Sequence, residues 1–292
     1  MNKHIIFTAA SWEPRFFSGF ERILTRFTPE RVVMYFFSEY ANLSQANRER
    51  IRSCCKTNSI TLEEFEVSFA DPIGTWKVLY ATAAAWCNGD SSAVIDITTM
   101  PRETTWILFG LFGDRAIPVT WAYHKPQGYN NTWLSRDPDR PRLVPKMGGV
   151  TKLGFPIKLL LTSGFDVERA RQLILFFEPE HVLVGIQTGI QFGNKLLNAA
   201  RHLQEFQGSS ATKLFEIDAY APDCGYESLE REIKEHLADS NLIMASLGPK
   251  TSAVALYRIH NKYPQTSLAY APSKEFNPDY SFGIAETLYG QL

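Results

Sequence analysis

The sequence predicts an α/β fold made of two successive parallel-sheet units, each with helices on both faces. Three observations predict it. Short apolar segments typical of buried strands alternate with segments typical of helices. Five blocks of sequence recur in the same order about 150 residues later. Each half also has a polar turn between an apolar strand and a helix that begins with a proline and a cation.

The first unit alternates strand and helix as far as Tyr123. Its predicted strands are His4–Ala9, Arg31–Phe37, Thr61–Phe69, Ala93–Ile97 and Ile117–Tyr123. The predicted helices between them are Glu13–Phe27, Asn42–Thr57, Thr75–Trp86 and Thr104–Phe112. A helix between successive strands is the connection that parallel strands require, so this order predicts a parallel sheet.

The second unit begins near Ile157 and repeats the first. In the recurring blocks, FDVER repeats SWEPR, FEPEHVLVGI repeats FTPERVVMYF, FEIDAYAP repeats FEVSFADP, and LAY repeats WAY. The proline–cation turn also occurs in both halves. We predict two Rossmann-like units that arose by internal duplication and pack about a pseudo-twofold axis, as the subunits of a homodimer would. The predicted boundaries are 1–123, 124–156 and 157–292.

Residues 124–156 interrupt the alternation. The block is rich in proline, glycine and asparagine, and its cations are Arg136, Arg140, Arg142, Lys146 and Lys152. This composition predicts a basic connector, either a loop or a small hairpin. Long irregular segments in compact proteins are usually functional or disordered. In the tail, we expect Lys274 and Tyr280 to cover a ligand cleft, or the tail to cap a last helix, Phe282–Tyr289.

Composition limits the possible classes of function. The chain has 292 residues, 45% of them hydrophobic, and a net charge of −1 from 30 basic and 31 acidic side chains. This balance argues against an extended nucleic-acid surface or a membrane-surface protein. No apolar run approaches the ~18–20 residues that span a bilayer, and we expect a cytoplasmic protein. The cysteines lack metal-ligand spacing, so we expect reduced thiols, no metal and no cofactor: Cys54, Cys55, Cys87 and Cys224.

The two matched turns are the strongest functional signal. They lie in AVIDITTMPRETTW, 93–106, and LIMASLGPKTSAVAL, 242–256, where Arg102 corresponds to Lys250 and Thr98 to Ser246. A strand-to-helix turn directs backbone N–H groups and the positive end of a helix at one place, which suits an anion. A cation at a helix start is unfavourable unless an anion lies between them. We therefore favour phosphate binding over two solvated helix starts.

Further ligand contacts are predicted from neighbouring positions. Because the carboxyl ends of parallel strands share one edge, the turn after the first strand belongs to the same site. The predicted ligand-binding residues are Ser11, Arg15, Thr98, Thr99, Arg102, Ser246, Gly248, Lys250 and Lys274. Arg15 and its counterpart Arg169 could equally form salt bridges between the units, and the hydroxyls of Thr98, Thr99 and Ser246 could instead cap helices. We expect the two strand edges to form one composite cleft.

No catalytic residue is identified. The sequence contains no GxGxxG, no GxSxG and no HExxH. Gly248-Pro249-Lys250-Thr251 is not a Walker A loop, because proline separates glycine from lysine. Whether the protein is an enzyme stays open.

At VIDITTMPR, 94–102, and IMASLGPKTS, 243–252, the sequence resembles CARF domains, the CRISPR-associated Rossmann fold. There a strand leads through a small polar turn to a Lys or Arg that opens a helix, and Ser11 and Ser163-Gly164 stand where the family has a polar turn after its first strand. The first turn departs from the family by having Thr98-Thr99-Met100 where glycines are usual. The resemblance implies a sensor of cyclic oligonucleotides held across a two-fold axis.

Three functions follow as hypotheses. The first is a nucleotide-binding sensor in antiviral defence, in which Arg102 and Lys250 contact phosphates in a cleft between the units. No effector domain is found, so this hypothesis includes a protein partner that carries the effector activity. The second is a phosphodiesterase, similar to a ring nuclease, that cleaves such a ligand. The third is a scaffold subunit of a defence complex with a vestigial pocket.

Overall fold

The structure is a computed structural model that describes residues 3–86, 91–130, 132–164, 167–188, 199–200, 202–204 and 211–292. Cys87 and the residues Phe165 and Asp166 of one recurring block lie outside the described residues. Contacts divide the chain into two compact units. Unit 1 comprises Met1–Thr132 and Asn277–Leu292, and unit 2 comprises Trp133–Phe276. The chain therefore passes between the units twice, and the division falls at other places than the predicted boundaries at 123 and 156.

Unit 1 contains a six-stranded sheet in the order β16-β5-β4-β1-β2-β3. Its strands are β1 Lys3–Ala9, β2 Pro29–Phe37, β3 Thr61–Val67, β4 Ser91–Asp96, β5 Val119–Lys125 and β16 Glu286–Gln291. The first five pair in parallel, whereas β16 runs antiparallel to β5. The order 3-2-1-4-5 of the parallel strands is that of a Rossmann-like unit.

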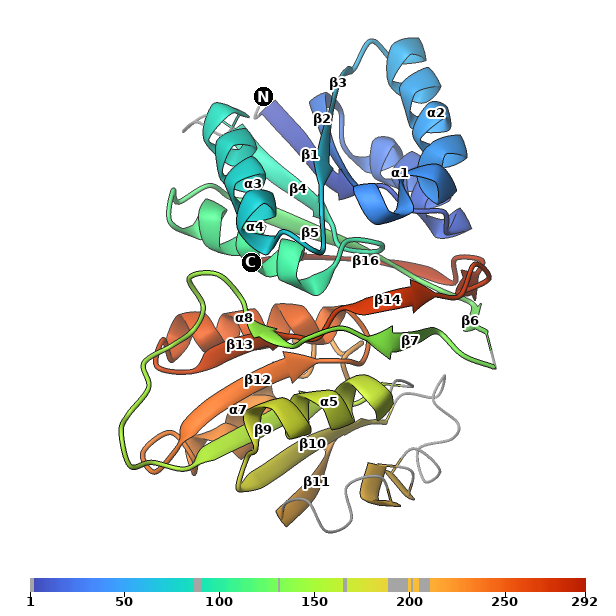
Figure 1. Ribbon diagram of the computed structural model, residues 1–292. Coiled ribbons are helices and arrows are strands. Elements are labelled where there is room, and N and C mark those ends of the chain that lie inside the picture. The colour runs from blue at the N-terminus through green and yellow to red at the C-terminus, as the bar shows by residue number, and fades with distance from the viewer. Residues whose placement is uncertain are drawn as a thin grey trace. The chain divides into compact units, whose positions relative to one another are not determined.

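Helices cover both faces of this sheet (Figure 1). They are α1 Pro14–Arg26, the 3-10 turn η1 Ser38–Tyr40, α2 Ala41–Thr57, α3 Pro72–Trp86 and α4 Arg102–Gly113. One core layer joins α1 and α2 to the sheet through residues such as Phe16, Val32 and Ile51. On the other face of the sheet, Phe7 packs against Phe112 of α4 with ring centroids 4.9 Å apart. Alternate side chains of a strand point to opposite faces, so a sheet buried on both faces needs the nearly continuous apolar strands that the sequence shows.

Unit 2 has the same strand order around a second sheet, β11-β10-β9-β12-β13-β8. Its strands are β8 Arg142–Leu143, β9 Ile157–Thr162, β10 His181–Gln187, β11 Ala211–Ile217, β12 Asn241–Ser246 and β13 Ser267–Tyr270. All pair in parallel except β8, which is antiparallel to β13. Its helices are α5 Val167–Phe177, α7 Tyr226–Lys234 and α8 Thr251–Lys262. Figure 1 shows α5 on one face of the sheet and α7 and α8 on the other.

The fold prediction is thus confirmed as an α/β protein with two Rossmann-like units. The shared strand order is what an internal duplication would leave, although descent from one ancestor stays a prediction. Among the residues that the structure describes, no helix combines the length and apolar character that crossing a bilayer requires.

The connector and the tail are built from short strands. They are β6 Gly128–Tyr129, β7 Ser135–Pro138, β14 Ser273–Phe276 and β15 Ser281–Phe282. β7 pairs with β14 in unit 2, and β6 pairs with β15 in unit 1. Thus β6 and β7 of the connector pair with strands of the tail, whereas β8 pairs with β13.

The predicted helix Phe282–Tyr289 is wrong. This stretch contains the last residue of β15 and the first four residues of β16, and Leu288 and Tyr289 of β16 pair with Tyr123 and Ala122 of β5. Pairing along the open edge of β5 satisfies backbone groups that a helix would leave exposed on that edge. The local spacing of apolar residues does not reveal such a long-range partner.

Candidate functional site

Both predicted turns lie where the strand order of their sheet reverses. In unit 1, β1 lies between β2 and β4, and in unit 2, β9 lies between β10 and β12. The turns after β1 and β4, and those after β9 and β12, thus follow the carboxyl ends of the two strands at the switch point. Open α/β sheets bind ligands at this position. The topology therefore places both predicted turns at the sheet edge where such folds bind ligands.

The unit 1 turn is closed by its own hydrogen bonds. Asp96 ends β4 fully buried, and its carboxylate accepts the backbone N–H of Thr98 at 3.0 Å and the hydroxyl of Thr8 at 3.4 Å. The hydroxyl of Thr98 in turn accepts the backbone N–H of His124 at 2.9 Å. Thr99 donates its hydroxyl to the carbonyl of Ala9 at 2.8 Å. Both threonine side chains therefore already have partners within the unit.

Arg102 is the first residue of α4 and is half-buried. The residue before it, Pro101, has an extended conformation and makes no side-chain cap. Lys250 is itself the residue before α8, has helical backbone angles and makes no side-chain cap. Pro101 and Lys250 thus occupy the N-cap positions of the two helices. Both helices begin at a half-buried cation.

Ser11 and Arg15 belong to a buried network after β1. The hydroxyl of Ser11 accepts the backbone N–H of Glu13 at 3.1 Å. The guanidinium of Arg15 donates to the Glu13 carboxylate at 2.6 Å, to the hydroxyl of Ser281 at 2.7 Å and to the carbonyl of His124 at 2.7 Å. Arg15 is thus an internal link within unit 1, which fixes the turn after β1 to the C-terminal segment.

The charge of Arg15 is maintained by its surroundings. Burial by itself lowers the pKa of the guanidinium, but the charge and hydrogen bond of the Glu13 carboxylate act against burial, and the pKa is raised. For the Tyr129 hydroxyl, burial has the opposite effect and raises the pKa well above its ordinary value. Arg15 is therefore cationic and the tyrosine neutral at any physiological pH, as a structural ion pair requires.

The unit 2 turn is built from a hydroxyl cluster and two close glycines. The hydroxyl of Ser252 lies 2.9 Å from both the Thr162 and the Ser246 hydroxyls and donates to the carbonyl of Pro249 at 2.8 Å. A Cβ atom on Gly164 would collide with the carbonyl of Leu247, and one on Gly248 with the carbonyl of Ser163. Only glycines allow the turns after β9 and β12 to approach this closely.

Gln187 lies beside this turn and was not predicted from the sequence. It ends β10 and is 2% exposed. Its Oε1 accepts the backbone N–H of Ala219 at 3.2 Å, whereas its Nε2 has no hydrogen-bond partner among the described residues. A Cβ atom on Gly248 would lie 3.0 Å from this Nε2. A polar residue at the end of an otherwise apolar strand, HVLVGIQ, was the available signal.

Lys274 lies on β14. Its Nζ lies 3.7 Å from the Asp137 carboxylate, and its side chain is 56% exposed. It lines a shallow groove of unit 2 with residues of α5 and the connector, namely Pro138, Asp139, Arg140, Pro141, Gln172, Leu175 and Phe176. The structure therefore assigns Lys274 to a different surface feature from the hydroxyl cluster at Ser246.

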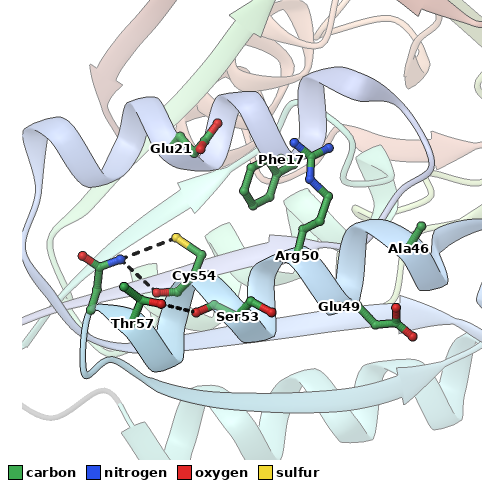
Figure 2. Close-up of a pocket in the computed structure, with 9 residues that line it drawn as sticks. Phe17, Glu21, Ala46, Glu49, Arg50, Ser53, Cys54 and Thr57 are labelled. Carbon is green, nitrogen blue, oxygen red and sulfur yellow. Dashed lines mark hydrogen bonds between the residues drawn. The ribbon is translucent and has the colours of Figure 1, made fainter.

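A second groove lies between α1 and α2 of unit 1 (Figure 2). Its lining includes Phe17, Glu21, Arg50 and Cys54. Burial, and then the Glu21 carboxylate, raise the pKa of the Cys54 thiol. Burial also raises the pKa of Cys55 to about 12. Because the thiolate is the reactive form, these cysteines are poor nucleophiles and metal ligands at neutral pH.

Among the described parts of the chain, no three His, Cys, Asp or Glu side chains are grouped as a metal would need. The two switch-point turns instead combine cations, hydroxyls, an amide and helix N-termini. These groups are suited to binding an oxyanion.

Comparison with known proteins adds evidence on the fold. No protein-family model and no curated protein matches the sequence. Among solved structures, a Type III CRISPR defence DNA nuclease activated by cyclic oligoadenylate is similar over 87% of this chain, with a TM-score of 0.55 and 9% identity. The match covers 63% of that nuclease, so this chain spans less than two thirds of its length.

Two other structures show weaker likeness. The cytoplasmic domain of a prokaryotic cation chloride cotransporter has a TM-score of 0.31 and 11% identity, with 93% of this chain and 96% of that one covered. A putative LacI transcriptional regulator from Bacteroides fragilis has a TM-score of 0.27 and 10% identity, with 92% and 77% covered. These two scores are too low to indicate a shared fold. The chain thus shares its α/β fold with part of the nuclease that cyclic oligoadenylate activates.

Proposed function

We propose that this protein is a sensor that binds the phosphates of a cyclic oligonucleotide at its switch-point turns. The observation that carries the proposal is the coincidence of two independent features. The turns that the sequence marks with Arg102 and Lys250 are the turns at which the strand order reverses in each sheet. A half-buried cation beside the positive end of a helix is stabilised when an anion binds between them.

The class of ligand comes from the fold. The similar nuclease is activated by cyclic oligoadenylate, and the CARF-like turns resemble the motif of sensors for such molecules. A ligand of this class carries several phosphates, which suits a chain with two cationic turns. The proposed output is a change in affinity for a partner protein that carries the effector activity in antiviral defence.

The proposal is tested by titration calorimetry of the full chain with a series of cyclic oligoadenylates. A charge-assisted hydrogen bond contributes about 1.5–3 kcal/mol, so we expect Lys250→Ala or Arg102→Ala to weaken binding about 10- to 100-fold. Lys213→Ala is the matched control, because Lys213 is an exposed lysine of unit 2 that pairs with Glu232 on the surface. If no cyclic oligoadenylate binds, or both cation variants retain the affinity of the unchanged protein, the proposal is wrong.

The same samples separate a sensor from a phosphodiesterase. We expect chromatography after a long incubation to recover the cyclic ligand intact. Linear products that disappear in the Lys250→Ala variant would favour the phosphodiesterase. Cleavage would need the 2′-hydroxyl held in line with its phosphate.

A further inference from the structure

Among the residues that the structure describes, the side-chain amide of Gln187 has an unused hydrogen-bond donor inside unit 2. The side chain is 2% exposed, and its Oε1 is held by the backbone N–H of Ala219 at 3.2 Å. This bond fixes the orientation of the amide, so that Nε2 points away from Ala219. Nε2 has no partner among the described residues. A buried donor without an acceptor costs free energy, and native proteins rarely keep one without a ligand or water to satisfy it.

The unused donor faces the turn before α8. Its Nε2 lies 3.0 Å from the position that a Cβ on Gly248 would take, and the carbonyl oxygen of Ser163 lies closer still to the same position, so the amide lies against the backbone of the turn. A second unpaired group lies in the same turn. The hydroxyl of Thr251, the first residue of α8, is buried and has no partner in the described part of the chain. The side chain of Thr251 is 1% exposed.

We propose that Gln187 Nε2 donates a hydrogen bond to an oxygen of a bound phosphate group, with the hydroxyl of Thr251 as a second contact. The proposal rests on the proposed function, since it adds residues to the Lys250 turn. An amide N–H, a hydroxyl, a lysine and the N-terminus of a 12-residue helix are together suited to an oxyanion and not to a metal cation.

Unit 1 has no counterpart of this amide at the matching place. Its β2 ends at Phe37, which is apolar, where β10 ends at Gln187. The unit 1 turn is also tied to β1 by the bond from Thr99 to Ala9. We therefore assign the stronger phosphate contact to unit 2, and expect variants of its turn to weaken binding more than variants of the unit 1 turn.

The variant that isolates the donor is Gln187→Glu. A glutamate keeps an oxygen that accepts the N–H of Ala219, has nearly the same shape and replaces the donor with a carboxylate oxygen. Gln187→Met removes both polar atoms without adding charge. The matched control is Gln204→Glu, which makes the same change of charge on an exposed side chain of the same unit.

The experiment labels the full chain with [15N]glutamine and follows the side-chain amide signals by NMR. The signal of Gln187 is the one missing from both Gln187 variants. We expect inorganic pyrophosphate to shift this signal in the unchanged protein. We also expect either Gln187 variant to weaken pyrophosphate binding about tenfold or more, and Gln204→Glu to leave it unchanged. Because the shift is measured on the unchanged chain, a variant that fails to fold does not block the test.

The outcomes distinguish this inference from the proposed function. If cyclic oligoadenylates fail to bind but pyrophosphate shifts the Gln187 signal, the oxyanion site stands and the sensor proposal is wrong. If cyclic oligoadenylates bind through Lys250 while the Gln187 signal stays in place and Gln187→Glu binds normally, the inference is wrong and the sensor proposal stands. If neither probe binds, both are wrong.

Discussion

The hydroxyl of Thr99 donates a hydrogen bond of 2.8 Å to the backbone carbonyl of Ala9 and so joins the turn after β4 to the end of β1. In unit 2 the residue that corresponds to Thr99 is Leu247, whose side chain has no hydroxyl to make this bond. There the backbone at Leu247 lies against Gly164, which has no side chain to keep it away. The two switch points share a topology but differ in chemistry. In unit 1 the two turns are joined by the side chain of Thr99, and in unit 2 they approach closely because Gly164 has no side chain.

Replacing Thr99 tests whether this bond holds the unit 1 turn together. Thr99→Val keeps the shape of the side chain but leaves the carbonyl of Ala9 without its donor. We expect a loss of about 0.5–1.5 kcal/mol in the free energy of unfolding, measured in urea. Thr61→Val is the control, because Thr61 is an exposed strand residue of the same unit. Equal stability of Thr99→Val and the unchanged protein would show that the bond contributes nothing.

The unit 2 turn is tested by adding single methyl groups. Gly164→Ala would place a Cβ against the carbonyl of Leu247, and backbone would have to shift. Overpacking of this kind typically costs about 1–3 kcal/mol, and we expect nucleotide binding to weaken as the turn moves. Gly148→Ala is the matched control in the same unit, since its Cβ would meet only a Leu143 methyl group at an ordinary 3.6 Å. A Gly164→Ala protein as stable as Gly148→Ala would contradict this account of the turn.

Much of the fold could be predicted because buried parallel strands require continuous apolar segments, which can be recognised in the local sequence. Segments such as RVVMYFF are too apolar to be half exposed, and proline with a cation marks the start of α4. The strand β16 was wrongly predicted as helix because its partner, β5, lies more than a hundred residues away in the sequence. Local periodicity contains no information about that pairing.

The candidate site was predicted less completely, for a physical reason in each case. The turns themselves were found because their backbone geometry demands recognisable residues. The partners of Arg15 could not be found, since Ser281 and His124 reach it only through tertiary folding. Gln187 was missed because one polar residue at a strand end looks the same whether its amide is paired or unpaired. Its role depends on the backbone N–H of Ala219 and on the close approach of Gly248, both of which arise only in the folded chain.

The network around Arg15 predicts that no other cation can replace it. Arg15 donates through Nε, Nη1 and Nη2 to three acceptors, two of them brought by β5 and the C-terminal segment. Lysine keeps the charge but cannot hold this planar arrangement, so acceptors are left buried and unpaired. We expect Arg15→Lys to lower the free energy of unfolding by about 1–3 kcal/mol. Arg52→Lys, on the surface beside Glu64, serves as the control and should cost less than about 1 kcal/mol.

The buried ring of His124 predicts how stability depends on pH. Burial lowers the pKa of His124, the charges of Arg22 and Arg15 lower it further, and the Asp96 carboxylate opposes them. The unfolded chain therefore binds a proton at His124 at a higher pH than the folded chain does. Below the ordinary histidine pKa of about 6.5, the unfolded state binds more protons than the folded state. The free energy of unfolding is therefore highest above that pH, as far as His124 is concerned, and decreases as the pH falls below it.

We expect the melting temperature to fall between about pH 7 and pH 5, and the fall to be smaller in His124→Asn. Asparagine offers a polar group near the position of Nδ1, which lies 3.0 Å from the hydroxyl of Thr287, but it does not titrate. The control is His181→Asn, which removes a histidine whose side chain is 44% exposed. This control should keep the pH dependence of the unchanged protein. The assignment to His124 is wrong if His124→Asn and His181→Asn lose stability equally as the pH is lowered.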